Sequence, residues 1–462
     1  MTDLATARPL DPTSRSTVDS IVARMERIPP TRLHLTARVI MGTATFFDAF
    51  DMLAISSMLP VLAGLWHLTP NDIGLIIAAG FAGQVIGALV FTRFAESHGR
   101  VSAAQYSILL FAVMSVVCAF SWGFTSLCVF RFIQGIGLGG EVPVAATYIN
   151  ELSRARRRGR FVLVYELVFP IGIVASTIIG SWLVPAFGWQ SMYIVGALPA
   201  LLLIGLRRHV PESPRWLANK GRLDDADRVT EMFERSAGAE TLPPPAEVGH
   251  SAGVGDQGTF SWRELLRPPY LSRTLVLWIN WCATAVISFA LGVWITTIYR
   301  TVFHLSLQDS LRLGIVLAIC ALTGSTLCAF LIDTVGRRAW LIAGQFVAGT
   351  AVLIVALSST PSVALVATCA SIAYGASSST AMALFLYSPE CYPTRFRAVG
   401  TGAATAWLRG ASIFAPVVVG AILTNSSLDK VFLFYAAAAY VASFAAIFGI
   451  ETKEKVLETL SR

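Results

Sequence analysis

Two aspartates stand three residues apart in an apolar stretch of this sequence. The segment FFDAFDMLA, residues 46–54, carries Asp48 and Asp51 at positions that share one face of a helix. A charge at the centre of a bilayer costs roughly 2.5–3.5 kcal/mol on insertion scales, so acids inside membrane helices usually pair with a cation or react. A buried acid that faces a buried arginine can act as a proton switch, because protonation of the acid releases the arginine.

The segment RFIQGIGLGGE, residues 131–141, supplies a matching cation. Arg131, Gln134 and Glu141 fall on one helix face, with Glu141 about 15 Å beyond Arg131 at 1.5 Å per residue. We expect Asp51 and Arg131 to form a proton-coupling pair, and we group Asp48, Glu141 and Glu166 with it. Two alternatives stay open. The pair could be static and only fix helix packing, and Glu166 could be the partner of an arginine.

Arg409 is the third informative charge, in the apolar segment AWLRGASIFAP. A guanidinium can hold a carboxylate through two parallel hydrogen bonds. No acid lies within the apolar runs of the same half of the chain, so we expect Arg409 to bind an anionic substrate. The alternative is a structural partner for a helix-end carbonyl. The expected pocket is completed by polar and aromatic side chains: Gln134, Phe47, Trp294, Tyr374 and Trp407, with Phe50 and Trp281 as further candidates.

Enzyme chemistry has little support in the sequence. The six histidines fall in loops or at helix ends, and the seven cysteines include no CxxC pair. No nucleophile and base are placed together in the apolar runs. We therefore expect no metal site, no cofactor and no enzymatic activity.

The elements that must position these residues are membrane helices. Of the 462 residues, 55% are hydrophobic and only 14% are charged, with a mean hydropathy of +0.65. Soluble domains are nearer a quarter charged, and a membrane helix needs roughly 20 mostly apolar residues. The sequence predicts an all-α membrane protein whose twelve spans lie near residues 38–62, 72–94, 102–122, 125–149, 161–184, 190–208, 274–298, 311–332, 340–359, 362–387, 398–423 and 431–450.

Charge predicts the orientation of these spans. Of 35 Lys and Arg residues, Arg131 and Arg409 lie inside spans, Arg300, Arg312 and Lys430 lie at outer ends, and the other 30 lie on one side. The positive-inside rule makes that side cytoplasmic, with both termini on it. The pI near 9.2 then reflects topology and anionic lipid, so we expect the lipid bilayer and no nucleic acid as a partner. We expect a monomer with no cleavable signal peptide.

The two halves of the sequence repeat each other. GALVFTRFAESHGR (87–100) corresponds to GSTLCAFLIDTVGRR (324–338), and ELSRARRRGR (151–160) corresponds to ECYPTRFRAVG (390–400). Two parallel six-helix repeats are typical of secondary transporters, whose site lies between the repeats near the midplane. The expected organisation is an N-terminal cytoplasmic segment (1–37), a six-helix bundle (38–210), a cytoplasmic central loop (211–273), a second bundle (274–450) and a cytoplasmic tail (451–462).

The repeated loops carry paired acids and bases. Charge-assisted hydrogen bonds at helix ends can hold one conformation closed and release it when they break. The alternative is that the basic residues only fix the topology. The residues that we expect in such a gating latch are Glu96, Arg100, Glu151 and Arg158 in the first half, and Asp333, Arg337, Arg338, Glu390 and Arg397 in the second.

Over essentially its whole length the chain resembles major facilitator superfamily transporters. GSTLCAFLIDTVGRR resembles the loop signature of that family, and RFIQGIGLGGEVP, PESPRWL, YSPECYPTRFRAVGTG and ETKEKVLETL resemble its sugar-porter and metabolite:proton-symporter branches. The first loop departs from the signature. Thr92 stands where the family usually has glycine, Glu96 replaces aspartate and Ser97 replaces a basic residue, so we expect a weaker or altered latch in that half.

The resemblance also bears on the substrate. Aromatic-acid and nicotinate (niacin) symporters tend to have D-x-x-D, here DAFD, although glycine is common where this chain has Ala49. Sugar porters typically have one acid, aligned with Asp51, and paired glutamines on helix seven that this chain lacks. The resemblance implies a proton-coupled symporter of the inner membrane for a small aromatic or heteroaromatic monocarboxylate such as nicotinate or benzoate. A sugar or polyol symporter and a non-transporting sensor on the same fold are the alternatives.

Overall fold

The computed structural model describes residues 18–29, 31–152, 166–201, 210–238, 242–244, 262–392 and 394–453. Every regular element in these ranges is helical. Eleven of these helices are long and apolar enough to cross a membrane. The predicted all-α membrane fold is therefore confirmed. The predicted span 190–208 begins with α8 (Gln190–Gly196) and a 3₁₀ helix (Leu198–Leu201), and its residues 202–209 lie outside the described ranges.

The first half is a bundle of long helices with local signals at their starts. Thr69 begins one of them, because its hydroxyl accepts a hydrogen bond from Asp72 N at 3.2 Å while Asp72 Oδ2 accepts one from Thr69 N at 2.9 Å. Pro70 then fits the first helical position. The helices of this half are α2 (Arg32–Leu65), α3 (Pro70–His98), α4 (Arg100–Ala119), α5 (Phe124–Leu152) and α7 (Val168–Phe187), followed by α8.

The second half repeats this arrangement with one irregular span. There α12 (Tyr270–Ala285) continues through a π-helical turn (Val286–Leu291) into α13 (Gly292–Thr301), so that three segments form one span. Such π turns occur often at functional sites. The remaining helices are α14 (Leu307–Val335), α15 (Arg337–Ala356), α16 (Val363–Glu390), α17 (Thr394–Asn425) and α18 (Leu428–Ala446).

Glycines bring α3 and α5 into backbone contact. A Cβ atom on Gly135 would lie 2.1 Å from the carbonyl oxygen of Gly80, and one on Gly139 would lie 2.0 Å from that of Gln84. No larger side chain fits at either position, and small residues of this kind are how membrane helices approach closely. The GIGLGG segment of α5 therefore serves helix packing, and it fixes the position of α3 beside α5.

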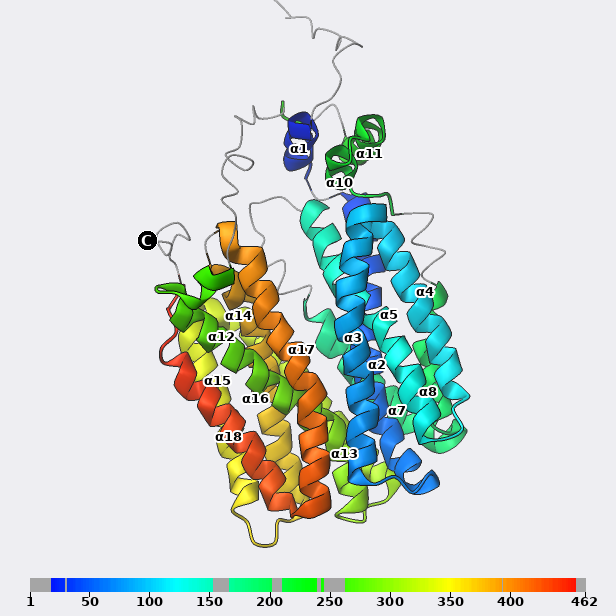
Figure 1. Ribbon diagram of the computed structural model, residues 1–462, viewed down its shortest axis with the longest axis vertical. Helices are drawn as coiled ribbons and strands as arrows, with labels where there is room; N and C mark the ends of the chain where they lie inside the picture. Colours follow the sequence, from blue (N-terminus) through cyan, green and yellow to red (C-terminus); the bar gives the residue numbers. More distant parts are fainter. Residues whose placement is uncertain are drawn as a thin grey trace, which may run out of the picture.

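Short helices cover one end of the first half. We call this end of the molecule the linker end, in both halves. Figure 1 shows α1 (Val18–Arg27), α10 (Pro214–Asn219) and α11 (Leu223–Ser236) beyond the ends of α2 and α4. Ion pairs join them, because Arg24 and Arg27 both contact Glu234, at 2.7 and 2.5 Å. The linker end thus carries a small polar layer attached to one half of the bundle.

The two halves are joined at the end opposite the linker end. Ser56 Oγ on α2 lies 2.8 Å from Thr296 Oγ1 on α13, and Gly420 on α17 packs against the backbone of Pro70. One cluster of buried apolar residues there contains members of both halves. Towards the linker end the buried members of each cluster come from one half, and Figure 1 shows the two halves apart.

Candidate functional site

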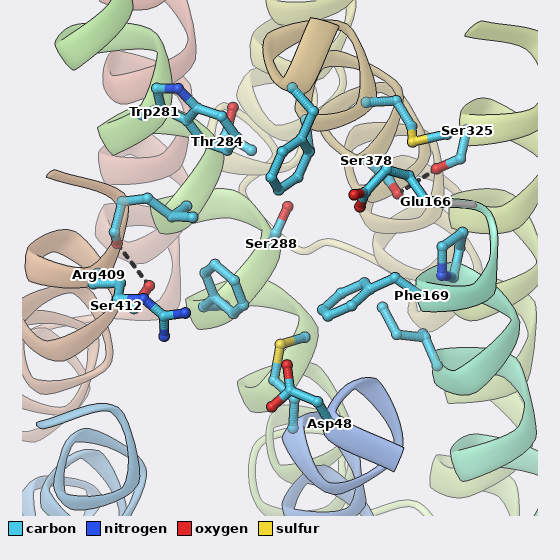
Figure 2. Close-up of a pocket in the computed structure, with 18 of the residues that line it drawn as sticks. Asp48, Glu166, Phe169, Trp281, Thr284, Ser288, Ser325, Ser378, Arg409 and Ser412 are labelled. Carbon is cyan, nitrogen blue, oxygen red and sulfur yellow. Dashed lines mark hydrogen bonds between the residues drawn. The ribbon is translucent and has the colours of Figure 1, made fainter. Parts of the chain in front are cut away.

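A cavity of about 160 Å³ lies between the two halves. Its wall is mostly apolar and aromatic, and Figure 2 shows side chains from both halves pointing into it. The charged residues that line it, among those that the structure describes, are Asp48 on α2, Glu166 just before α7 and Arg409 on α17. Hydroxyl groups of the second half add polar points to the wall: Thr284, Ser288, Ser325, Ser378 and Ser412.

Arg409 joins the two halves at this cavity. Its Nη1 donates a hydrogen bond of 2.9 Å to Oε1 of Gln84 on α3. Asp48, from the first half, lines the same cavity as Arg409. The sequence showed no acid near Arg409 in its own half, and the structure supplies one from the other half. Gln84 was missed, since a single amide in the apolar segment FAGQVIGALV was its only signal.

Asp48 and Asp51 face different surroundings. Asp48 lines the cavity, whereas Asp51 is 2% exposed and turns into the first half. Its Oδ2 lies 3.6 Å from Arg131 Nη1, and its Oδ1 accepts a hydrogen bond of 3.0 Å from Gln134. The contact that we expected between Asp51 and Arg131 is therefore present, while its role in proton coupling stays a prediction.

Gln134 is committed to this buried network. Besides Asp51, its amide donates to Ser115 at 2.8 Å, and it does not line the cavity. Its expected part in substrate binding therefore has no support from its position. Gln134 instead holds Asp51 in place beside Arg131.

Glu141 and Glu166, the other two acids that we grouped with the pair, lie beside the cavity and in its wall, respectively. Glu141 is 4% exposed and accepts a hydrogen bond of 3.2 Å from Thr45, which lines the cavity. Its second oxygen has no partner among the described residues. Glu166 lines the cavity directly. Their role in coupling also stays a prediction.

The expected aromatic residues separate into two groups. Tyr374 and Trp281 line the cavity. Phe47, Phe50 and Trp294 do not line it and pack in or against the core that the two halves share. Trp407 is 48% exposed and lies against Trp278 at a ring distance of 5.2 Å, away from the cavity. The cavity aromatics that sequence reasoning missed are Phe81, Phe169, Phe289 and Phe385.

The expected gating residues form matching ion pairs in the two halves. Arg100 Nη2 lies 2.9 Å from Glu151, and Arg337 Nε lies 3.2 Å from Glu390. Arg337 also contacts Asp333, at 2.9 Å. Each pair lies within one half, and no ion pair between the described residues crosses between the halves.

Four expected gating residues lack such an ion pair with a described residue or cannot be placed. The Glu96 side chain is exposed and has no ion pair with a described residue, in line with the altered loop around it. Arg158 lies outside the described residues, and only the backbone of Arg397 is described. Arg338 contacts the backbone oxygen of Ile447.

Two carboxylates that the sequence left without a role complete these clusters. Glu212 accepts a hydrogen bond of 2.9 Å from Arg100 N, and Glu451 accepts one of 3.0 Å from Arg337 N. Both cap a helix start that follows a glycine with positive φ, Gly99 at 105° and Gly336 at 96°. The signal was available, because Glu212 and Glu451 lie in PESPRWL and ETKEKVLETL at the same offset as Glu151 and Glu390.

Loss of the Glu390 contacts should loosen the linker end of the second half. Glu390 accepts hydrogen bonds from Arg337 and Thr452, whereas the Asp333 side chain is 70% exposed. We expect Glu390→Gln to raise maleimide labelling of the neighbouring Cys391, which is 1% exposed, by several-fold. Asp333→Asn should raise it less, because an exposed pair contributes only about 0.2–1 kcal/mol. Labelling of Cys391→Ser measures the background from the other cysteines. Unchanged labelling in both variants would mean that the basic residues of these loops only fix the topology.

Comparison with known proteins places this architecture. The family model for the sugar (and other) transporter matches residues 39–462, which is most of the chain. The chain belongs to this sugar (and other) transporter family. It is therefore a secondary transporter of the major facilitator superfamily, a multi-pass membrane protein and not an enzyme, as the sequence predicted.

Several relatives align with this chain over almost their full length. The niacin transporter NiaP of Acinetobacter baylyi is 30% identical, over 95% of this chain and 99% of its own. The 4-hydroxybenzoate transporter PcaK of the same organism is 29% identical, over 94% and 95%. Among solved structures, a partially occluded inward-open conformation of the xylose transporter XylE from E. coli has a TM-score of 0.72 at 17% identity. That match covers 89% of this chain and 98% of XylE, and it shows the shared fold.

Proposed function

We propose that this transporter is a proton-coupled symporter that imports a small aromatic or heteroaromatic monocarboxylate, such as nicotinate or benzoate. The observation that carries the proposal is Arg409 in an aromatic-lined cavity of about 160 Å³. A cavity of roughly 150 Å³ holds a benzene ring in another protein, so one ring fits here. The guanidinium supplies the charge-assisted hydrogen bonds that a carboxylate needs. The relatives named for niacin and 4-hydroxybenzoate transport support the same substrate class.

The Asp51–Arg131 pair is the proposed proton-coupling element. Both side chains are buried, and Asp51 has an oxygen without a hydrogen-bond partner among the described residues. A proton taken up by Asp51 neutralises the acid and releases Arg131 to its other partners, Gln134 and Tyr193. Asp48, which shares the cavity with Arg409, places a second acid next to the substrate. Uptake of a proton and binding of an anion are then linked by charge.

The packing of the two halves supports alternating access. The halves share one apolar cluster at the end opposite the linker end, and their latch ion pairs lie within each half. We place the linker end in the cytoplasm, with both termini, because the positive charges of the loops lie on that side. The inner membrane is the proposed location, and the conformation corresponds to a transporter closed towards the outside.

A ligand screen tests the substrate class directly. Nicotinate and benzoate should raise the unfolding temperature of the purified protein, whereas xylose, glucose and polyols should leave it unchanged. In proteoliposomes, an inward proton gradient should drive accumulation of the stabilising acid, and a protonophore should abolish it. Stabilisation by a sugar and not by any acid would replace the proposal with a sugar or polyol symporter. Stabilisation by an acid without transport would favour a sensor.

A further inference from the structure

Two acids, Asp48 and Glu166, line the cavity together with Arg409, and Glu166 lies on the side away from Arg409. Figure 2 shows Arg409 on one side and Glu166 on the other, with Ser288 between them. Glu166 comes from the first half and Arg409 from the second, so a molecule that reaches both would bridge the halves. The cavity therefore has a cation on one side and an acid on the opposite side, with Ser288 and a mostly apolar wall between them.

The carboxyl group of Glu166 has no partner among the cavity-lining residues that the structure describes. Among the described residues it makes no hydrogen bond and no ion pair, although Arg409, Arg131 and Glu141 all have such contacts. The next residues along the chain that line the cavity are Phe169 and Pro170, which offer no side-chain hydrogen bond. Glu166 is only partly exposed, so a ligand that fills the cavity would displace the water around its carboxyl group and leave that group to hydrogen-bond with the ligand.

A second polar group in the wall also lacks a partner. The Tyr374 hydroxyl has no hydrogen-bond partner among the described residues, and Tyr374 lines the same cavity from α16. Near Glu166, Ser325 and Ser378 already bond to each other at 2.8 Å, as the dashed line in Figure 2 shows. The cavity wall therefore contains two polar groups without a hydrogen-bond partner among the described residues, the Tyr374 hydroxyl from the second half and the Glu166 carboxyl from the first. One aromatic ring would fill this cavity.

We propose that Glu166 recognises a polar group on the part of the aromatic ring remote from the carboxylate. This rests on the proposed function, and it narrows the substrate class to ring carboxylates that also carry a hydroxyl group or a ring nitrogen. A carboxyl group can accept a hydrogen bond from a hydroxyl and, when protonated, donate one to a ring nitrogen. Glu166 is then a specificity residue and not the group that couples transport to protons.

The test compares acids of similar size by their dissociation constants for the purified transporter. The panel is benzoate, 3- and 4-hydroxybenzoate, nicotinate, and 3- and 4-methylbenzoate, which replace the polar group by a methyl group. At least one polar acid should bind the wild type about ten-fold more tightly than its apolar counterpart, which is the matching methylbenzoate for a hydroxybenzoate and benzoate for nicotinate. Glu166→Leu should remove most of that preference, whereas Glu166→Gln, which still hydrogen-bonds, should keep part of it. Glu231→Leu, on the exposed surface of α11, is the matched control.

Each result has a separate meaning for the two proposals. Equal affinity of every polar acid and its apolar counterpart for the wild type would overturn the role of Glu166 without any variant, and would leave the aromatic-acid proposal intact. An unchanged preference in Glu166→Leu would do the same. Loss of proton-driven accumulation of every acid in Glu166→Gln, with binding retained, would make Glu166 a coupling group instead. Failure of all the acids to bind the wild type would overturn the proposed function as well.

Discussion

Arg409→Ala should weaken binding of the transported acid by about ten- to a hundred-fold. The guanidinium is the one cation among the described residues that line the cavity. A charge-assisted hydrogen bond contributes roughly 1.5–3 kcal/mol, which corresponds to that loss in affinity. Arg409→Lys should restore only part of the affinity, because an ammonium group cannot form the two parallel bonds of a guanidinium. Dissociation constants from calorimetry with the purified transporter measure both effects.

The amide analogue of the substrate separates direct contact from an indirect effect. It should bind the wild type poorly and lose little further affinity in Arg409→Ala, because it carries no negative charge. Gln84→Ala is the matched control, since it breaks the same hydrogen bond between the halves and leaves the charge of Arg409 in the cavity. Equal losses for the acid and the amide would make Arg409 a structural residue and remove the main support for an organic anion.

Asp51→Asn should abolish accumulation of substrate against a gradient while exchange and binding persist. The asparagine oxygen can still accept the hydrogen bond that Gln134 donates to Asp51 Oδ1, so the fold of the network should survive. The variant has no acid to protonate, however, and Arg131 loses its opposite charge. Uptake driven by an imposed proton gradient, compared with counterflow of labelled substrate in the same proteoliposomes, measures the two activities separately.

Asp48→Asn provides the comparison within the same helix. Asp48 lines the cavity near Arg409, so its loss should change substrate affinity, in contrast to Asp51→Asn. Full proton-driven accumulation by the Asp51→Asn variant would eliminate Asp51 as the coupling acid. The pair would then be a static contact that fixes the packing of α2 against α5.

The spans and the two halves could be predicted because a helix that crosses lipid must be long and apolar. Long apolar runs, repeated loops and one-sided positive charge indicate the spans and the two halves. The contact between Asp51 and Arg131 followed from the same logic, since two buried charges within one bundle are each costly alone. The acid caps Glu212 and Glu451 had an equally regular signal, a repeat at one offset, but that signal was not used.

The lining of the cavity could not be predicted in the same way. Which face of a helix points inward depends on its rotation, and packing between helices sets that rotation. Trp281 and Trp294 lie on one continuous span, yet only Trp281 lines the cavity. The π-helical turn between them changes the register of the side chains. No residue pattern in its sequence, VISFAL, predicts that turn. The approach of Asp48 to Arg409 depends on how the two halves meet.

The glycine contacts between α3 and α5 have a mechanical consequence. The backbones of α3 and α5 touch at Gly80, Gln84, Gly135 and Gly139, so the two helices cannot slide past each other without a steric clash. We therefore expect them to move as one rigid unit, which carries Arg131 on α5 and Gln84 on α3. On the proposed mechanism, a shift of Arg131 after protonation of Asp51 would also shift Gln84, which hydrogen-bonds to Arg409, so proton binding and substrate binding would act on the same pair of helices.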